Sequence, residues 1–297
     1  MNEYWATTVD WNGVCEELRY HRGTRLHYLS MPLLLTASHH SSTGLREQNE
    51  DVAGLLMPAD PELSTTGVIA AVADGVSGSE DGRAAAEYCV STLLADYTAM
   101  SEELPVAEAL DNAVQAINRS LRQLGHGRMA TTLTSLVVRG NAYYFAHVGD
   151  TRLYLLRNGA LQCLTSDHVG NHADTRHVLT RAIGLDARIR HDHGSGELQT
   201  GDIFLLASDG VWGALSDSDL EWHLSTLAED PPDPGYTAKL LVDAALANGS
   251  KDNVTAVVLR VLQLPDAKHR DPLARWKILG ALALLLNLLL LYWLVVG

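Results

Sequence analysis

Four aspartates stand at the ends of apolar segments, where a carboxylate lies at the edge of a buried core. Asp74 and Asp209 each follow an apolar run and precede a glycine, Asp150 follows AYYFAHVG, and Asp252 precedes Asn253 and VTAVVLRV. A carboxylate in such a place loses hydration and needs a compensating partner. Converging carboxylates repel one another unless a cation lies between them, and all-oxygen ligation suits Mg²⁺ or Mn²⁺. The pattern indicates either a multi-carboxylate metal site or a set of ordinary turns.

The elements that must position these aspartates are short strands and longer helices. Apolar runs rich in β-branched residues and bounded by Gly, Asp or Asn predict strands at 68–73, 133–138, 142–148, 153–156, 203–207 and 254–261. Helical spacing predicts helices at 82–100, 106–124, 217–228 and 236–247. Gly140-Asn141 and Asn158-Gly159 predict tight hairpins, so we expect antiparallel sheets whose faces are covered by helices. The expected fold class is α+β.

Composition limits the function classes. The chain has 297 residues, 46% of them hydrophobic, and a formal net charge of −14. An acidic surface repels phosphate backbones, which argues against nucleic acid as a partner. Cys15, Cys89 and Cys163 form no Cys-x-x-Cys pair, so neither a disulfide framework nor a zinc site is indicated. We expect a reducing compartment, with Cys89 and Cys163 as core residues.

The segment 278–296 differs from the rest of the chain. It reads ILGALALLLNLLLLYWLVV, without a charge and with Asn287 as its one strongly polar residue. This length is sufficient to cross a bilayer core, although a buried soluble helix is the alternative. Basic residues precede it, and the positive-inside rule then keeps the body of the protein in the cytoplasm: Lys268, Arg270, Arg275 and Lys277. The sequence therefore predicts a membrane protein with a single-pass C-terminal anchor.

Six ordered segments resemble the metal-dependent serine/threonine protein phosphatases of type 2C, in their bacterial form. They are GLREQNED, AVADGVSG, ATTLTSLVVRGNAYYFAHVGDTRLYLLRNG, LTRAIG, GDIFLLASDGVW and SKDNVTAVVL. The resemblance runs from about Leu33 to Leu262. It implies a four-layer αββα sandwich of two antiparallel β-sheets flanked by helices, to which the terminal segment adds one transmembrane helix.

The resemblance also implies a metal-ligand set. Asp74 would bridge two Mn²⁺ or Mg²⁺ ions, with the carbonyl of Gly75 on one of them. Asp209 and Asp252 would complete the shell of the second ion. Asp150 would join Asp209 on a third ion of the kind seen in bacterial members. A water or hydroxide that bridges two such ions loses a proton near neutral pH and can attack phosphorus.

The remaining implied roles fall on residues near this set. Glu50 would hold a coordinated water and Asp51 would support it, so both belong to the expected metal site. Arg46 would bind the substrate phosphate through its planar fork, and with Asp74 it makes up the catalytic pair. Val76 stands where the eukaryotic branch has a histidine proposed as general acid, so the leaving group must obtain its proton elsewhere.

Four neighbouring residues have weaker assignments. Asn253 is expected to order the turn at Asp252 rather than to bind metal, and Arg152 to support the loop of Asp150 through an ion pair. The segment 169–178, VGNHADTRHV, is shorter than the flap usual in bacterial members. Its histidines are either proton donors or solvated loop residues, the second being favoured: His172 and His177.

These inferences divide the chain into an N-terminal extension of unknown role (1–32), a phosphatase catalytic domain (33–263), a basic juxtamembrane linker (264–277) and a transmembrane helix (278–296). The favoured function is hydrolysis of phosphoserine and phosphothreonine in proteins at the cytoplasmic face of a membrane. Its partners would be phosphorylated targets of a Ser/Thr kinase. The alternatives are a weakly active family member that binds phosphoproteins as a scaffold, and a phosphatase of a small phosphoester.

Overall fold

The computed structural model describes residues 33–59, 62–170, 172–175, 178–226 and 233–265. The predictions for 1–32, for most of the linker and for the helix at 278–296 lie outside these residues. Within the described ranges, no helix is both long enough and apolar enough to cross a membrane.

Two five-stranded sheets form the centre of the fold, and every neighbouring pair of strands is antiparallel. The first sheet has the order β1 (Leu34–Ser42), β10 (Val254–Gln263), β9 (Ile203–Ala207), β6 (Arg152–Arg157) and β7 (Ala160–Cys163). The second has the order β2 (Asp51–Leu56), β3 (Val68–Asp74), β4 (Leu133–Arg139), β5 (Ala142–Val148) and β8 (Asp192–Glu197).

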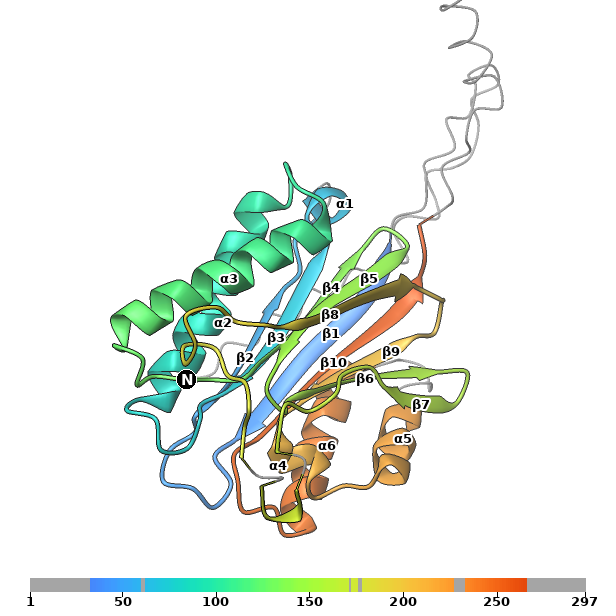
Figure 1. Cartoon of the computed structure of the whole chain (residues 1–297). Helices are drawn as coiled ribbons and strands as arrows, with labels where there is room; N and C mark the ends of the chain where they lie inside the picture. Colours follow the sequence, from blue (N-terminus) through green and yellow to red (C-terminus); the bar gives the residue numbers. More distant parts are fainter. Residues whose placement is uncertain (1–32, 60–61, 171, 176–177, 227–232, 266–297) are drawn as a thin grey trace, which may run out of the picture. The chain divides into compact units, whose positions relative to one another are not determined.

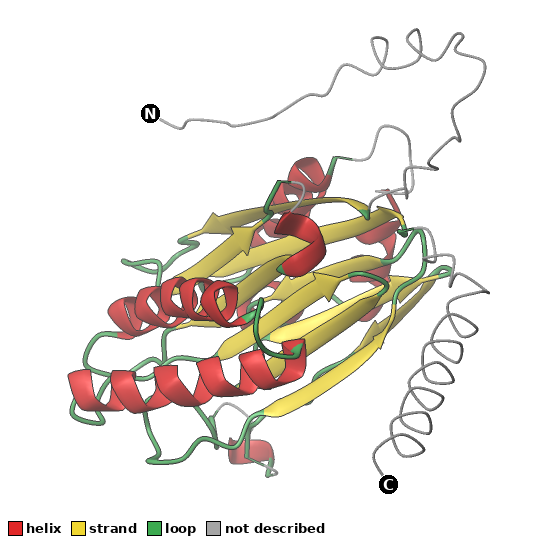
Figure 2. Ribbon diagram, turned by 90° about the horizontal axis from the view of Figure 1, so that it is seen from above, coloured by secondary structure: helices red, strands yellow, loops and turns green. Residues whose placement is uncertain are grey.

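Helices cover the outer face of each sheet. The second sheet packs against α2 (Gly82–Met100) and α3 (Val106–Leu124), and the first sheet packs against α5 (Asp217–Ser225) and α6 (Pro234–Ala247) (Figures 1 and 2). Short helical segments complete the list: α1 (Glu62–Thr65), η1 (Ala173–Thr175) and α4 (Asp209–Trp212). The described part of the chain is thus a helix–sheet–sheet–helix sandwich, as the sequence predicts.

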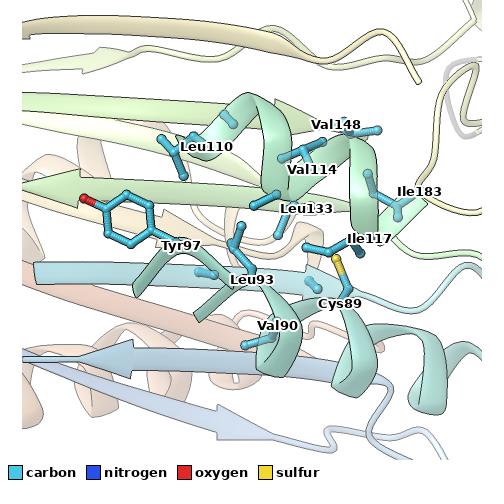
Figure 3. Close-up of a cluster of buried hydrophobic side chains, with 14 of the residues drawn as sticks. Cys89, Val90, Leu93, Tyr97, Leu110, Val114, Ile117, Leu133, Val148 and Ile183 are labelled. Atoms are coloured by element: carbon cyan, nitrogen blue, oxygen red, sulfur yellow. The ribbon is translucent and has the colours of Figure 1, made fainter. Parts of the chain in front are cut away.

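The strand β3 shows why the apolar runs lack alternation. Ile69 faces the core beneath α2 and α3, whereas Val68 and Val72 face the core between the two sheets. A strand buried on both faces reads as a continuous apolar run. Cys89 lies in the helix-covered core, as predicted, beside the side chains drawn in Figure 3. The prediction for Cys163 was wrong, because it ends the short edge strand β7 and is exposed.

Several elements were absent from the sequence prediction, namely β1, β2, β7, β8 and the short helical segments. The strand β8 reads DHGSGE and alternates in exposure, so it carries no apolar signal. It forms by pairing with the edge of β5, where Gly194 and Gly196 lie opposite Phe145 and Tyr143. A Cβ on Gly194 would lie 2.5 Å from the Phe145 ring, so the glycines make room for these aromatic side chains.

Candidate metal centre

Five aspartates gather where strands of both sheets end. Asp51 begins β2 and lies directly opposite Asp74, the last residue of β3. Asp209 follows β9 as the first residue of α4, Asp252 precedes β10, and Asp150 follows β5. A pocket of about 330 Å³ is lined by four of them, Asp74, Asp150, Asp209 and Asp252. Residues up to 201 positions apart in sequence, Asp51 and Asp252, therefore share one electrostatic environment.

This environment disfavours negative charge. Burial is the largest cause that raises the pKa of Asp51 to about 7, of Asp209 to about 7 and of Asp150 to about 6. Burial also raises the pKa of Asp74 well above its usual value, and the neighbouring carboxylates raise it further. Full ionisation of the cluster therefore requires nearby positive charge.

The donor atoms fit a hard divalent cation. Oδ1 of Asp51 and Oδ1 of Asp209 are buried and have no hydrogen-bond partner among the described residues. Carboxylate oxygens without nitrogen or sulfur donors suit Mg²⁺ or Mn²⁺ better than zinc. In the described ranges no group of three or more His, Cys, Asp or Glu side chains is arranged to hold an ion as it stands. The carboxylates thus surround one pocket without forming a closed ligand cage.

Close backbone packing fixes the turns that carry the aspartates. A Cβ on Gly210 would lie 2.0 Å from the carbonyl oxygen of Asn253, and one on Gly44 would lie 2.0 Å from that of Asp252. A Cβ on Gly75 would likewise lie 2.4 Å from the carbonyl carbon of Gly82, the first residue of α2. The glycines after Asp74 and Asp209 are therefore required by close contacts with other segments and do more than turn the chain.

The side chain of Asn253 orders the loop before β2, whereas the sequence prediction assigned it to the turn at Asp252. Its Nδ2 donates to the carbonyls of Thr43 and Gln48, both at 2.9 Å. Its Oδ1 accepts a hydrogen bond from the backbone N–H of Glu50 at 2.8 Å. Both Arg46 and Glu50 lie in the loop that this one amide holds.

Arg46 lies at the rim of the cluster. Its Nη2 is 2.7 Å from Oδ2 of Asp252, and half of its side chain is exposed. The hydrogen bond with Asp252 is the main cause that raises the Arg46 pKa. A pocket of about 270 Å³ brings Arg46 together with Glu50, Asp74 and Asp252. The half-exposed Arg46 side chain beside the carboxylates could therefore hold an anion.

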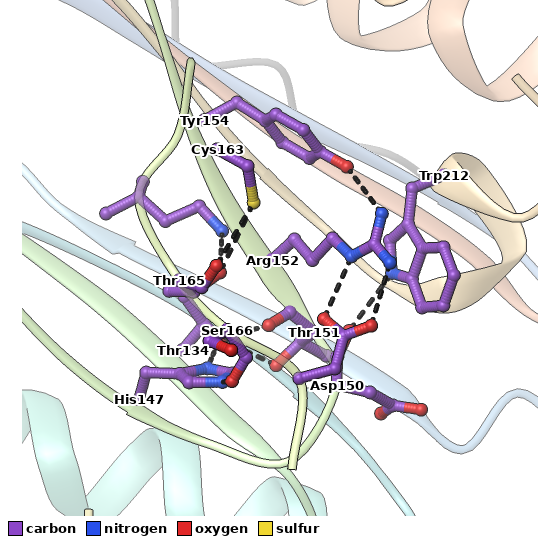
Figure 4. Close-up of polar contacts among 12 residues, drawn as sticks. Thr134, His147, Asp150, Thr151, Arg152, Tyr154, Cys163, Thr165, Ser166 and Trp212 are labelled. Carbon is purple, nitrogen blue, oxygen red and sulfur yellow. Dashed lines mark hydrogen bonds and ion pairs between the residues drawn. The ribbon is translucent and has the colours of Figure 1, made fainter. Parts of the chain in front are cut away.

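The backbone around Asp150 is held from several sides. The N–H of Gly149 donates to Nδ1 of His168 at 3.1 Å, and the N–H of His168 donates to the Gly149 carbonyl at 2.7 Å. The indole Nε1–H of Trp212 donates to the carbonyl of Asp150 at 3.1 Å (Figure 4). The position of Asp150 is therefore set by groups from two other segments.

Arg152 supports this loop, although its ion pair is with Asp167. Nε and Nη2 of Arg152 donate to the two carboxylate oxygens of Asp167 at 2.9 and 2.7 Å. The guanidinium lies 3.6 Å from the centre of the Trp212 ring, whose N–H holds Asp150. The predicted support is thus indirect and passes through an aromatic ring.

Sequence reasoning missed several residues that position the cluster. Thr132 Oγ1 accepts from the N–H of Asp74 at 2.9 Å, and Ser208 Oγ donates to Oδ2 of Asp51 at 2.7 Å. His168 holds the neighbouring Gly149, and Trp212 holds the carbonyl of Asp150. Ser208 directly precedes Asp209, so adjacency to a predicted ligand was the available signal. The other contacts depend on tertiary structure.

The position of Val76 bears on which group supplies the proton to the leaving group. Val76 lines the carboxylate pocket. His172 is exposed, and His177 lies outside the described residues. His168 holds the backbone of Gly149, since its Nδ1 accepts a hydrogen bond from the Gly149 N–H.

Comparison with known proteins shows the family to which the chain belongs. Residues 60–240 match the family model described as protein phosphatase 2C. The chain belongs to this family. It is 28% identical over 242 residues to the serine/threonine phosphatase stp of Listeria monocytogenes, a match that covers 72% of this chain and 91% of that relative.

Solved structures agree with this assignment. The fold is similar to the serine/threonine phosphatase PstP/Ppp of Mycobacterium tuberculosis, with a TM-score of 0.63 and 28% identity, covering 78% of this chain and 100% of that one. The catalytic domain of PstP in complex with two manganese ions gives a TM-score of 0.62 and 30% identity, with the same coverage. The chain is therefore a protein-serine/threonine phosphatase of bacterial type, and Mn²⁺ or Mg²⁺ is its cofactor.

Proposed function

We propose that this phosphatase hydrolyses phosphoserine and phosphothreonine in proteins and so reverses the action of a Ser/Thr kinase. The observation that carries the proposal is a pocket lined by four aspartates that follow or precede strands of both sheets, with Asp51 beside Asp74 and Arg46 at the rim. Such a site combines negative charge for divalent cations with a guanidinium for the anionic substrate.

The residues proposed to hold the ions are those that share the pocket or its edge. Asp74 would contribute to two ions and the carbonyl of Gly75 to one of them. Asp209 and Asp252 would complete the second ion's ligands, and Asp150 with Asp209 would hold a third. When bound, the ions supply Lewis-acid chemistry that activates water for attack on phosphorus. Glu50 and Asp51 would support the same site from the loop before β2 and from its first residue.

The protein's own groups orient the substrate. Arg46 would bind the phosphate through paired N–H groups, and its pair with Asp252 aims the guanidinium at the carboxylate pocket. Asn253 keeps the Arg46 loop in place through its three hydrogen bonds to that loop. Val76 has no proton to donate, so we propose that solvent water in the open pocket protonates the leaving alkoxide.

We also propose that the protein acts at the cytoplasmic face of a membrane. The proposal rests on the uncharged segment 278–296 and on the basic residues before it. The full chain should sediment with membranes and require detergent for extraction, whereas a chain that ends before Leu273 should not. Recovery of the full chain in the supernatant without detergent would refute this part.

The catalytic proposal is tested with two substrates. The full chain, supplied with Mn²⁺, should hydrolyse both p-nitrophenyl phosphate and a phosphothreonine peptide. Asp209→Asn should lower both rates at least about 100-fold, because it removes a proposed ligand, and the exposed Asp217→Asn should not. Turnover of the small ester alone would favour the small-phosphoester function. Peptide binding without any turnover would favour a scaffold.

A further inference from the structure

The carboxylate pocket adjoins a second hollow. The second hollow has a volume of about 480 Å³ and is lined partly by Gly127, Arg128 and Ala130. Val76, Ser77 and Leu185 line both hollows. The pocket that contains Arg46 also adjoins the carboxylate pocket, since both are lined by Asp74, Gly75, Ser77 and Asp252. We call these three adjoining hollows, which share lining residues beside the carboxylates, the groove.

Leu185 is the residue of this groove that most needs an explanation. It is 40% exposed, although it is a large apolar side chain. It also stands at the junction of the two hollows, beside the partly exposed Val76. An exposed leucine on a surface turn is common by itself. Its position beside a phosphatase site and its fixed backbone make this one different.

The turn that carries Leu185 is held from α3. Asn118 is fully buried, and it accepts from the N–H of Gly184 at 2.8 Å while its Nδ2 donates to the carbonyl of Asp186 at 2.9 Å. Arg122 donates to the carbonyl of Leu185 itself. Gly184 has φ +97°, and a Cβ there would lie 2.4 Å from the carbonyl oxygen of Met129. Leu185 therefore projects from a pre-organised turn.

The far end of the groove is polar. Arg128 Nε lies 3.1 Å from Oε2 of Glu80, and both side chains are more than half exposed. Between this pair and the carboxylates the lining includes the apolar residues Val76, Ala130 and Leu185, together with Ser77, Ser79 and glycine backbone. Apolar side chains between two polar regions suit an extended polypeptide that carries one apolar side chain near its phosphorylated residue.

We infer that Leu185, together with Val76, forms a subsite for an apolar residue of the substrate protein close to its phosphorylated residue. This inference deepens the proposed function and rests on it for the identity of the ligand. Leu185 is thereby a specificity-determining residue, because burial of two apolar surfaces against each other favours one peptide over another.

The test compares peptides in pairs. Phosphothreonine peptides carry either leucine or serine at each of the three positions on either side of the phosphothreonine. With the full chain and Mn²⁺, leucine at one of these positions should raise kcat/KM about tenfold over serine. Leu185→Ser should reduce that ratio below about twofold, and the conservative Leu185→Met should retain it.

A matched control separates a subsite from a general surface effect. Leu34 is 38% exposed, lies at the start of β1, and is outside the three hollows. Leu34→Ser should leave the leucine-to-serine ratio as in the unsubstituted chain. A ratio near one at every position in the unsubstituted chain, or a ratio that Leu185→Ser leaves intact, overturns the inference.

Binding distinguishes failure of the inference from failure of the proposed function. The same peptides, labelled with fluorescein, are titrated with the Asp209→Asn chain and followed by anisotropy. Tighter binding of the leucine peptide supports the subsite if the preference is lost when Leu185→Ser is added. This holds even if the unsubstituted chain hydrolyses no peptide, and that result would refute only the proposed function. Equal Kd values for leucine and serine peptides, with turnover of both, overturn the subsite and leave the function standing.

Discussion

Ser208 connects the two sheets at the metal centre. Its hydroxyl donates to Oδ2 of Asp51 at 2.7 Å, and its oxygen accepts from the N–H of Thr255 at 3.0 Å. Asp51 belongs to β2 and Thr255 to β10, so one small side chain serves strands of different sheets. Ser208 itself is fully buried. We therefore expect Ser208→Ala to lower the free energy of unfolding by more than the loss of a single hydrogen bond would.

The cost follows from the two groups that are left without partners. Oδ1 of Asp51 already has no hydrogen-bond partner among the described residues, and Ser208→Ala removes the donor of Oδ2. The N–H of Thr255 loses its side-chain acceptor at the same time. A buried polar group left unsatisfied costs about 1–3 kcal/mol, so the two together should lower the free energy of unfolding by about 3 kcal/mol.

Ser135 provides a matched control. It is also fully buried, and its hydroxyl donates only to the neutral carbonyl of Ala146 at 3.2 Å. Loss of one neutral hydrogen bond costs about 1 kcal/mol, so Ser135→Ala should be the milder change. Urea unfolding without divalent ions, followed by far-UV circular dichroism, should separate the two midpoints by roughly 1 M. Equal midpoints would refute the argument that Ser208 satisfies two buried groups.

Three further predictions concern the same end of the sandwich. His147 is fully buried, and burial lowers its pKa to about 4. The stability that neutral His147 contributes is therefore fully present above pH 6.5 and is lost as the pH falls toward 4. Between pH 7.5 and 5 the free energy of unfolding of the unsubstituted chain should fall by about 2 kcal/mol, a loss that His147→Gln should not show. Mn²⁺ should raise the melting temperature, because a cation offsets repulsion among the carboxylates. The rise should be smaller in Asp209→Asn. An equal rise in both proteins would contradict the proposal that Asp209 is a metal ligand. Gly210→Ala places a Cβ 2.0 Å from the carbonyl oxygen of Asn253, so the turn at Asp252 must move. We expect kcat/KM for p-nitrophenyl phosphate to fall at least about tenfold as a result. Activity within twofold of the unsubstituted chain would show that the turn accommodates the methyl group without loss of function.

The sequence predicts elements well where burial dictates composition. The ranges expected for α2 and α3 match the structure. The helix α3 has a regular apolar face, and the buried residues of α2 recur mostly at three- and four-residue steps. The hairpin at Asn158-Gly159 is also present, with φ of +53° and +76°, and joins β6 to β7. The strand β8 could not be predicted, since its residues are polar or glycine and its existence depends on the free edge of β5.

The site divides in the same way. An aspartate at a strand end is recognisable in the sequence because it ends an apolar run, so Asp74 and Asp209 could be predicted. The groups that hold them could not. Ser208 contacts Asp51 across 157 positions, and the indole of Trp212 reaches the carbonyl of Asp150 across 62. Such contacts depend on the register of both sheets, which no local pattern specifies.

The pairing of β1 with β10 has a consequence for synthesis on the ribosome. The first described strand finds its partner only when the last one has emerged, because Leu35 pairs with Val261 and Ser42 with Val254. Asp252 and the amide of Asn253, which orders the Arg46 loop, arrive in that same final stretch. A nascent or prematurely ended chain therefore lacks both the closing strand and part of the site. The phosphatase should become active only once translation of the domain is nearly finished, and incomplete products should be catalytically silent.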